Sequence, residues 1–276
     1  MNKDLVRNYY ATFDQSEWDR LTWPEGRIEY AITAHALNVH LPMPSNVLDI
    51  GGGPGRWSVW LAQHGNTVVL ADLSPNLLEI ARGKIDEAKV SSQVRGITVA
   101  DVCDLSRWPD DTFDAVLCLG PLYHLPDAMD RDQAMREVAR VLKPNGVAFV
   151  AFMPVYGFLR RTLALVDEQH HLADEMFVSN LLEHGVFIND VAGRFNAGYG
   201  VRPAEVKPFM ARFGFRQLEL LADTGFATSQ AQQLEELSKT NSAAYAAAMD
   251  IIIRTANDPS ILGASVHLLY VGKLNK

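Results

Sequence analysis

The feature that most constrains the fold of this chain is a regular alternation of short apolar runs with helical patterns between residues 47 and 152. Between the apolar runs, Leu77, Leu78, Ala81 and Ile85 recur at helical spacing after a Ser74-Pro75 start signal. This alternation is typical of a parallel sheet with helices on both faces. Candidate strands rich in β-branched residues lie at 47–50, 68–71, 97–100, 115–119 and 147–152.

Two further candidate strands at 215–222 and 265–273 bring the predicted sheet to seven. Residues 1–40 precede the first strand, and we expect them to form a helical N-terminal cap over the cleft. Residues 153–202 are expected to form a mostly helical insertion after strand five, loosened in its second half by several glycines and able to supply a substrate pocket. The predicted segments are therefore 1–40, 41–152, 153–202 and 203–276.

Composition narrows the class of partner and the compartment. The formal net charge of -8 disfavours nucleic acid, whose binding relies on Lys and Arg to neutralise phosphates. The two cysteines, Cys103 and Cys118, do not suggest a disulfide framework. The apolar runs fall short of the roughly 18 residues of a membrane span, and the N-terminus lacks a signal-peptide pattern. We therefore expect a cytoplasmic monomer or homodimer that binds a small molecule, with no nucleic-acid or membrane partner.

A glycine-rich turn carries the strongest functional signal. Gly51, Gly53 and Gly55 follow the strand that ends in Asp49-Ile50, and a helical run over 56–64 comes next. Glycine allows a ligand to approach the backbone closely at such a strand-to-helix turn. The dinucleotide fingerprint would need its third glycine at position 56, where this chain has Arg56. An NAD-dependent oxidoreductase is therefore disfavoured.

The run from Asp49 to Gly55 resembles motif I of the class I S-adenosylmethionine-dependent methyltransferases. Asp72 and Asp101 end the next two strands, as the acidic residues of that family do, and residues 113–125 and 142–146 resemble its later motifs. The resemblance covers about residues 45–152. It implies an α/β, Rossmann-like, seven-stranded, mostly parallel sheet with helices on both faces.

The resemblance also implies S-adenosylmethionine as methyl donor, with S-adenosylhomocysteine as its product. Asp72 would accept hydrogen bonds from the ribose hydroxyls, although it could instead cap the following helix. Asp101 would face the adenine amino group, with Val102 N–H near the ring and Asp104 as a competitor. The expected cofactor-binding residues are Asp49, Gly51, Gly52, Gly53, Gly55, Asp72, Leu73, Asp101, Val102 and Leu119.

Methyl transfer from a sulfonium is an in-line displacement that depends on positioning the reactants. His124, just beyond strand four, is a candidate base or substrate-orienting residue, and Tyr123 a second candidate for catalysis or for shaping the pocket. Tyr10, Arg27 and His124 are candidate substrate contacts.

The N-terminal charged run is expected to be a solvated helix face, although one arginine could hold the methionine carboxylate. This run consists of Glu17, Asp19, Arg20, Arg27 and Glu29.

Two other histidine positions have structural interpretations. His170 and His171 are adjacent, so on a helix they would point about a hundred degrees apart, and no carboxylate has a recognisable ligand spacing. We therefore expect no catalytic metal. His267 is expected to be a packed, hydrogen-bonded residue of the last strand rather than a substrate contact.

Methylation of a small-molecule acceptor is the leading functional hypothesis. A sensor or scaffold that binds S-adenosylmethionine without transferring its methyl group is an alternative, because a fold does not fix an activity. A nucleic-acid or protein methyltransferase is a weaker alternative. The sequence Gly120-Pro121-Leu122-Tyr123 lacks the Asn/Asp-Pro-Pro-aromatic pattern of DNA amino-methylating enzymes.

Overall fold

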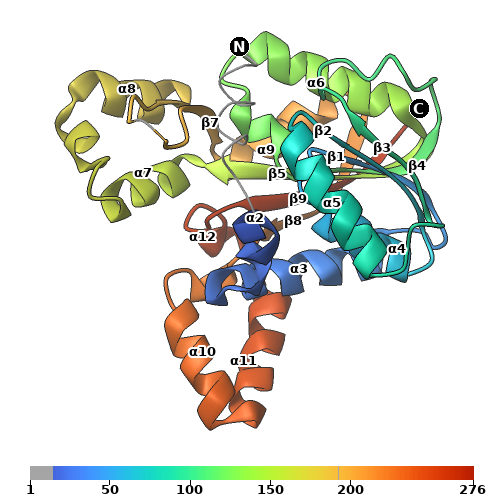
Figure 1. Cartoon of the computed structure of the whole chain (residues 1–276). Helices are drawn as coiled ribbons and strands as arrows, with labels where there is room; N and C mark the ends of the chain where they lie inside the picture. Colours follow the sequence, from blue (N-terminus) through green and yellow to red (C-terminus); the bar gives the residue numbers. More distant parts are fainter. Residues whose placement is uncertain (1–14, 192) are drawn as a thin grey trace.

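A computed structural model describes residues 15–191 and 193–276 of the chain (Figure 1). Its centre is a twisted sheet in which seven strands follow the order β3-β2-β1-β4-β5-β9-β8. β9 is antiparallel to β5 and β8, and the other pairings of this core are parallel. The core strands are β1 (Asn46–Ile50), β2 (Thr67–Asp72), β3 (Val94–Val99), β4 (Phe113–Cys118), β5 (Leu142–Pro154), β8 (Phe215–Ala222) and β9 (Leu268–Leu274). The predicted mostly parallel sheet is confirmed.

The sheet has nine strands, so the predicted count of seven is wrong by two. The additional strands, β6 (Val186–Ile188) and β7 (Ala197–Val201), come from the insertion after β5. β7 joins the end of β5 through Met153 opposite Gly200. A Cβ on Gly200 would lie 3.0 Å from Val155 Cα, and one on Gly198 would lie 2.7 Å from Tyr123 O. These glycines therefore permit close strand packing, where the sequence suggested a loosened segment.

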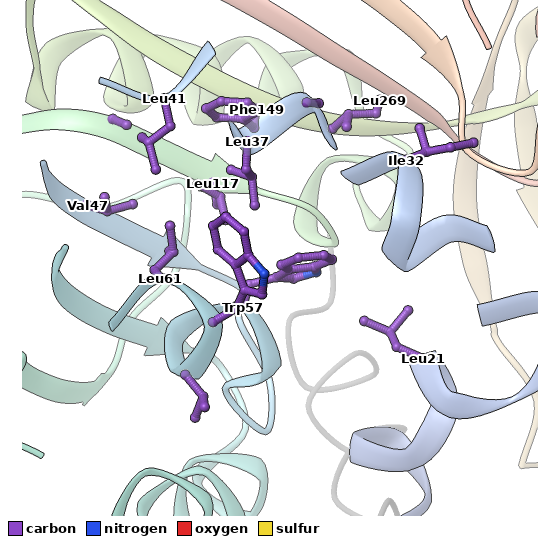
Figure 2. Packing of buried hydrophobic residues seen from close by; sticks show 14 of the residues in the cluster. Leu21, Ile32, Leu37, Leu41, Val47, Trp57, Leu61, Leu117, Phe149 and Leu269 are labelled. Atoms are coloured by element: carbon purple, nitrogen blue, oxygen red, sulfur yellow. The ribbon is translucent and has the colours of Figure 1, made fainter. Parts of the chain in front are cut away.

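Helices cover both faces of the sheet because successive residues of each strand point to opposite sides. On one face, Val47, Leu117 and Phe149 pack against helices α3 (Pro24–His40), α4 (Arg56–Gln63) and α5 (Pro75–Glu87). Figure 2 shows Leu37 of α3 and Leu61 of α4 beside these strand residues. On the other face, α6 (Ala128–Val141) and α9 (Pro203–Ala211) cover the alternate strand residues. The predicted two-faced covering is confirmed.

The N-terminal cap is helical where the structure describes it, with α2 (Gln15–Asp19) and a 3-10 turn η1 (Arg20–Thr22) before α3. α3 packs mainly on the sheet, where Ile32 and Leu37 are buried with Leu269 (Figure 2). Of the cap residues that the structure describes, only those from α2 to the first turns of α3 border the functional cavity described below. Tyr10 lies outside the described residues.

The insertion begins with α7 (Val155–Ala164), a 3-10 turn η3 (Gln169–Ala173) and α8 (Glu175–His184). With β6 and β7 it encloses its own small aromatic core, formed by Phe158, Phe177, Phe187 and Phe195. This unit projects from the end of β5 (Figure 1) and contacts Tyr123. It is helical in its first half only, so the expectation of a mostly helical insertion holds for residues 155–184.

Between β8 and β9 the chain forms α10 (Ala231–Thr240), α11 (Ser242–Thr255) and the short α12 (Pro259–Leu262). α10 and α11 make a hairpin that projects away from the sheet beside α3 (Figure 1). Among the described residues, none of the helices combines the length and apolar character that crossing a bilayer requires. The division of the chain at residues 40, 152 and 202 stays a prediction.

Two predicted boundaries differ from the structure. The last strand begins at Leu268, because Ser265 Oγ and His267 N–H both donate to Asp223 Oδ1 and hold residues 265–267 in a loop. The predicted turn at 143–146 is an irregularity within β5, where Asn145 has a φ of 64°.

Candidate functional site

A cavity of about 1140 Å³, including space open to solvent, lies where β1, β2 and β4 end. Ligand sites of open α/β sheets lie at this carboxyl edge. All the predicted cofactor-binding residues except Gly55 line the cavity, and so do Tyr123 and His124. The N-terminal cap contributes Glu17, Arg20, Leu21 and Glu29 to the wall.

The glycine turn forms the floor of the cavity. Gly51 and Gly53 have φ values of 73° and 53°, which favour glycine. A Cβ on Gly51 would lie 2.5 Å from Pro121 Cδ, and one on Gly52 would lie 2.6 Å from Asp49 Cγ. The turn can therefore lie close to Pro121, which follows β4, and to the end of β1 only because these residues lack side chains.

Gly55 does not line the cavity, although the sequence suggested that it binds the cofactor. It precedes α4 with a φ of 82°, and an added Cβ would lie 3.1 Å from Ala81 Cβ of α5. Its role is to start α4 and let α4 approach α5.

Asp49 is buried at the end of β1, where Ser58 Oγ donates to its Oδ2 at 2.7 Å. Burial raises the pKa of Asp49 to about 6, and the nearby charge of Asp72 adds to the shift. The ionised carboxylate of Asp49 beneath the glycine turn therefore destabilises the folded protein at neutral pH.

Asp72 connects the end of β2 to the glycine turn. Its Oδ2 accepts from Gly53 N–H at 2.9 Å, and its Oδ1 accepts from Ser74 N–H at 2.8 Å. Burial raises the pKa of Asp72 although these backbone donors act against the shift. Ser74 caps α5 through Leu77 N–H, so the alternative that Asp72 is the helix cap is not needed.

Asp101 and Asp104 compete in the sequence for the adenine position, and only Asp101 lines the cavity. Asp101 Oδ1 accepts from Cys103 N–H at 2.9 Å, which fixes the carboxylate beside Val102. Asp104 Oδ1 accepts from Ser106 N–H in an exposed turn. The geometry thus favours the Asp101 assignment.

Tyr123 and His124 lie on the 3-10 turn η2 (Pro121–His124) after β4. The His124 ring packs against Tyr123 and Phe195 at centroid distances of 5.0 and 4.5 Å. Burial lowers the pKa of His124 to about 3, and the neighbouring His267 adds to the effect. Since such an imidazole is neutral and accepts a proton poorly, the geometry argues against His124 as the base and leaves it an orienting role.

The N-terminal charged run is only partly a solvated face. Arg20 Nη1 and Nη2 donate to the two oxygens of Glu29 at 2.7 and 3.0 Å, and Arg20 Nε donates to Glu17 at 3.2 Å. These three residues line the cavity, whereas Arg27 is exposed and donates to Thr22 O on the outside. Arg20 is therefore the arginine of this run that lines the cavity, and a substrate contact of Arg27, which lies outside it, stays a prediction.

Sequence reasoning missed Asp223, and it assigned His267 only a packed role. The two side chains meet with His267 Nδ1 3.0 Å from Asp223 Oδ2, and the His267 ring stacks on Tyr123 at 5.3 Å. The hydrogen-bonded state predicted for His267 is present. No sequence motif identified Asp223, because its partner His267 lies 44 residues away in the chain.

The expectation about His170 and His171 needs correction. Their rings lie 4.0 Å apart on η3, and Asp190 Oδ1 lies 3.5 Å from His171 Nε2. The divergence expected for an α-helix does not apply to this turn, and a carboxylate is close after all. His171 Nε2 is also 3.0 Å from Asn189 Oδ1, which gives it a structural partner. The absence of a catalytic metal stays a prediction.

The strand order, with one antiparallel strand next to β5, and the glycine turn followed by acidic strand ends define a class I, Rossmann-like methyltransferase domain. Residues 48–150 match the family model described as a methyltransferase domain. This part of the chain is therefore a methyltransferase domain, as its sequence motifs indicated.

Curated relatives match the same part of the chain. Methyltransferase GfsG of Streptomyces halstedii is 40% identical over 123 residues, which are 44% of this chain and 42% of that protein. The ubiquinone biosynthesis O-methyltransferase of Xanthomonas campestris pv. campestris is 36% identical over 125 residues, covering 45% and 48%. The match thus spans less than half of the length of these relatives.

Solved structures share the fold over most of the chain. The PH0226 protein of Pyrococcus horikoshii OT3 has a TM-score of 0.61 at 18% identity, covering 97% of this chain and 99% of that one. The Burkholderia thailandensis 1,6-didemethyltoxoflavin-N1-methyltransferase, solved with bound 1,6-didemethyltoxoflavin and S-adenosylhomocysteine, has a TM-score of 0.59 at 14% identity, covering 99% of this chain and 88% of that one. At these identities the likeness concerns the fold.

Proposed function

We propose that this protein transfers a methyl group from S-adenosylmethionine to a small-molecule acceptor by in-line displacement. The observation that carries the proposal is a single cavity that joins the glycine turn, Asp72 and Asp101 to Tyr123 and His124. An in-line displacement needs a donor site and an adjoining acceptor site, because the two reactants must be held at near-attack distance.

The residues of the cavity fit the proposed donor. A carboxylate offers about four lone-pair sites, and Asp72 spends one per oxygen on Gly53 and Ser74, so it retains capacity for the ribose hydroxyls. Within the described residues, three N–H groups of Arg20 donate to Glu17 and Glu29, and the other two remain available to the carboxylate of the methionine part. When bound, the donor supplies an electrophilic methyl group on a sulfonium.

The chain's own residues would orient the reactants and exclude water. With the adenosine directed to Asp72 and Asp101, the methyl group would face Tyr123 and His124 of η2. Burial raises the pKa of Tyr123 and so keeps its phenol neutral, and His124 is neutral as well. Both side chains therefore act as uncharged polar walls that hold an acceptor in line.

A low-mass acceptor is favoured over nucleic acid by the net charge of -8, which would repel phosphates. The insertion supports the same conclusion, because its aromatic core packs against the cavity residues Tyr123 and His124 and so holds them in place. The name of one relative, an O-methyltransferase of ubiquinone biosynthesis, also supports an organic acceptor. We also propose that the protein is a cytoplasmic monomer or homodimer.

The test uses the full chain and a donor labelled in its methyl group. Bacterial extract is separated into low-mass, protein and nucleic-acid fractions, and each is incubated with protein and donor. Label is expected in the low-mass fraction only. Label in protein or nucleic acid would contradict the small-molecule acceptor. Donor binding in a calorimeter without transfer to any fraction would favour a sensor or scaffold.

A further inference from the structure

The Asp223–His267 pair is built into the same edge of the sheet as the cavity. Asp223 directly follows β8, and His267 directly precedes β9, with Ala222 opposite Leu268 in the antiparallel pairing. Asp223 Oδ1 also accepts from Ser265 Oγ and from His267 N–H, both at 2.8 Å. Sheet register and three hydrogen bonds therefore fix the carboxylate, and the carboxylate fixes the imidazole.

The hydrogen bond to Asp223 determines which nitrogen of His267 remains available. Since the carboxylate accepts from Nδ1–H, the neutral ring carries its lone pair on Nε2. Within residues 15–191 and 193–276, no group hydrogen-bonds Nε2, and 17% of the side chain is exposed. The His267 ring stacks on Tyr123, and its Nδ1 lies 4.0 Å from Glu29 Oε2. Tyr123 and Glu29 both belong to the cavity wall.

We propose that His267 is the general base of the methyl transfer and that the acceptor is an alcohol or phenol hydroxyl. This inference rests on the proposed function. His267 Nε2 takes the hydroxyl proton as the oxygen bonds to the methyl carbon, and the C–S bond breaks with its electron pair passing to sulfur. The imidazolium is stabilised by Asp223 and later returns its proton to water, so charge and atoms balance.

The choice of a hydroxyl follows from the need for a base. A neutral amine can attack first and lose its proton afterwards, and a carboxylate is already ionised at neutral pH. A phenol, with a pKa of about 10, or an alcohol gains most from a base positioned beside it. The presence of a carboxylate-oriented imidazole beside the wall residue Tyr123 therefore favours a hydroxyl.

The charges around His124, which lines the cavity, and His267, which stacks on the wall residue Tyr123, separate their roles. Burial alone would lower the pKa of His267, but the hydrogen bond and charge of Asp223, with Glu29, outweigh it and raise the pKa. For His124, burial lowers the pKa most and His267 adds to the effect, so this ring stays neutral. The other charged or titratable groups facing this cluster are Arg20 from η1, Glu17 from α2, Tyr123 from η2 and Arg160 from α7.

A cation held by Glu29, Asp223 and His267 is the competing use of this cluster, because one ligand atom from each lies within 4.8 Å of the others. Two observations disfavour it. Both oxygens of Glu29 accept from Arg20, and Nδ1 of His267 is committed to Asp223. A metal would have to displace the guanidinium and the imidazole proton.

The experiment first identifies the methylated atom in the labelled low-mass product. Hot hydriodic acid cleaves methyl ethers to volatile methyl iodide, while N-methyl and C-methyl groups resist it, and mild alkali cleaves methyl esters. Label that is released by the acid and stable to alkali is expected. Label that resists the acid or is lost in alkali would overturn the hydroxyl assignment and leave the methyltransferase function intact. No transfer to any fraction would overturn both.

The second part measures kcat against pH with the purified acceptor. For His267→Gln we expect a loss of about 10²- to 10⁴-fold in kcat, with unchanged affinity for S-adenosylhomocysteine as the check on folding. Wild-type kcat should fall as His267 becomes protonated at low pH, and this limb should vanish in His267→Gln, move to lower pH in Asp223→Asn and persist in His124→Asn. The exposed His170→Gln is the matched control. A limb retained in His267→Gln, or activity removed by EDTA and restored by Mg²⁺, would overturn the base role.

Discussion

Replacing Asp72 by Asn separates cofactor binding from support of the glycine turn. The carboxylate accepts Gly53 N–H on one oxygen and Ser74 N–H on the other. In Asn, the amide nitrogen would replace one of these acceptors and face a backbone donor, which costs about 1–3 kcal/mol when buried. The free protein should therefore unfold at a lower temperature than the wild type.

The same substitution should weaken the cofactor further. A hydrogen bond to a charged acceptor contributes about 1.5–3 kcal/mol, so losing the ribose contact predicts a Kd for S-adenosylhomocysteine raised about 10- to 150-fold. Calorimetric titration measures this value, and Asp86→Asn, at an exposed position of α5, is the control. Wild-type affinity in a folded but less stable Asp72→Asn protein would refute the ribose role and leave Asp72 as a support for the turn.

Three further predictions follow from the described geometry. Because the folded-state pKa of Asp49 is raised to about 6, its charge costs stability as pH rises through 4 to 6. The free energy of unfolding of Asp49→Asn, measured with denaturant, should thus exceed that of the wild type by about 3 kcal/mol at pH 7 and by little near pH 4. Gly52→Ala should lose about 1–3 kcal/mol in denaturant unfolding, because its Cβ would lie 2.6 Å from Asp49 Cγ, whereas Gly83→Ala, in open space on α5, should gain stability. Asp101→Asn should weaken adenosine binding in a calorimeter and Asp104→Asn should not; equal effects would remove the distinction between them.

Much of the sheet could be predicted because its strands are apolar on both faces and are separated by clear helix signals. β7 could not, since a strand with glycines at 198 and 200 has little apolar pattern of its own. Its position depends on the close approach of its backbone to Val155 and Tyr123, which are distant in sequence.

The candidate site divides in the same way. Asp72 and Asp101 were predictable, because the ends of successive parallel strands meet at one edge. The sequence predicted Arg20 on a solvated helix face, whereas in the structure both of its terminal nitrogens donate to Glu29. Asp223 and His267 belong together only through the antiparallel pairing of β8 and β9, which no local spacing reveals.

The central claim is that one cavity holds the methyl donor with its reactive end towards η2. A crystal structure of the full chain with S-adenosylhomocysteine tests it directly. We predict the ribose hydroxyls on Asp72, the adenine beside Asp101 and Val102, and the sulfur facing Tyr123 and His124. Adenine beside Tyr123, or the ligand bound outside the cavity, would contradict the account.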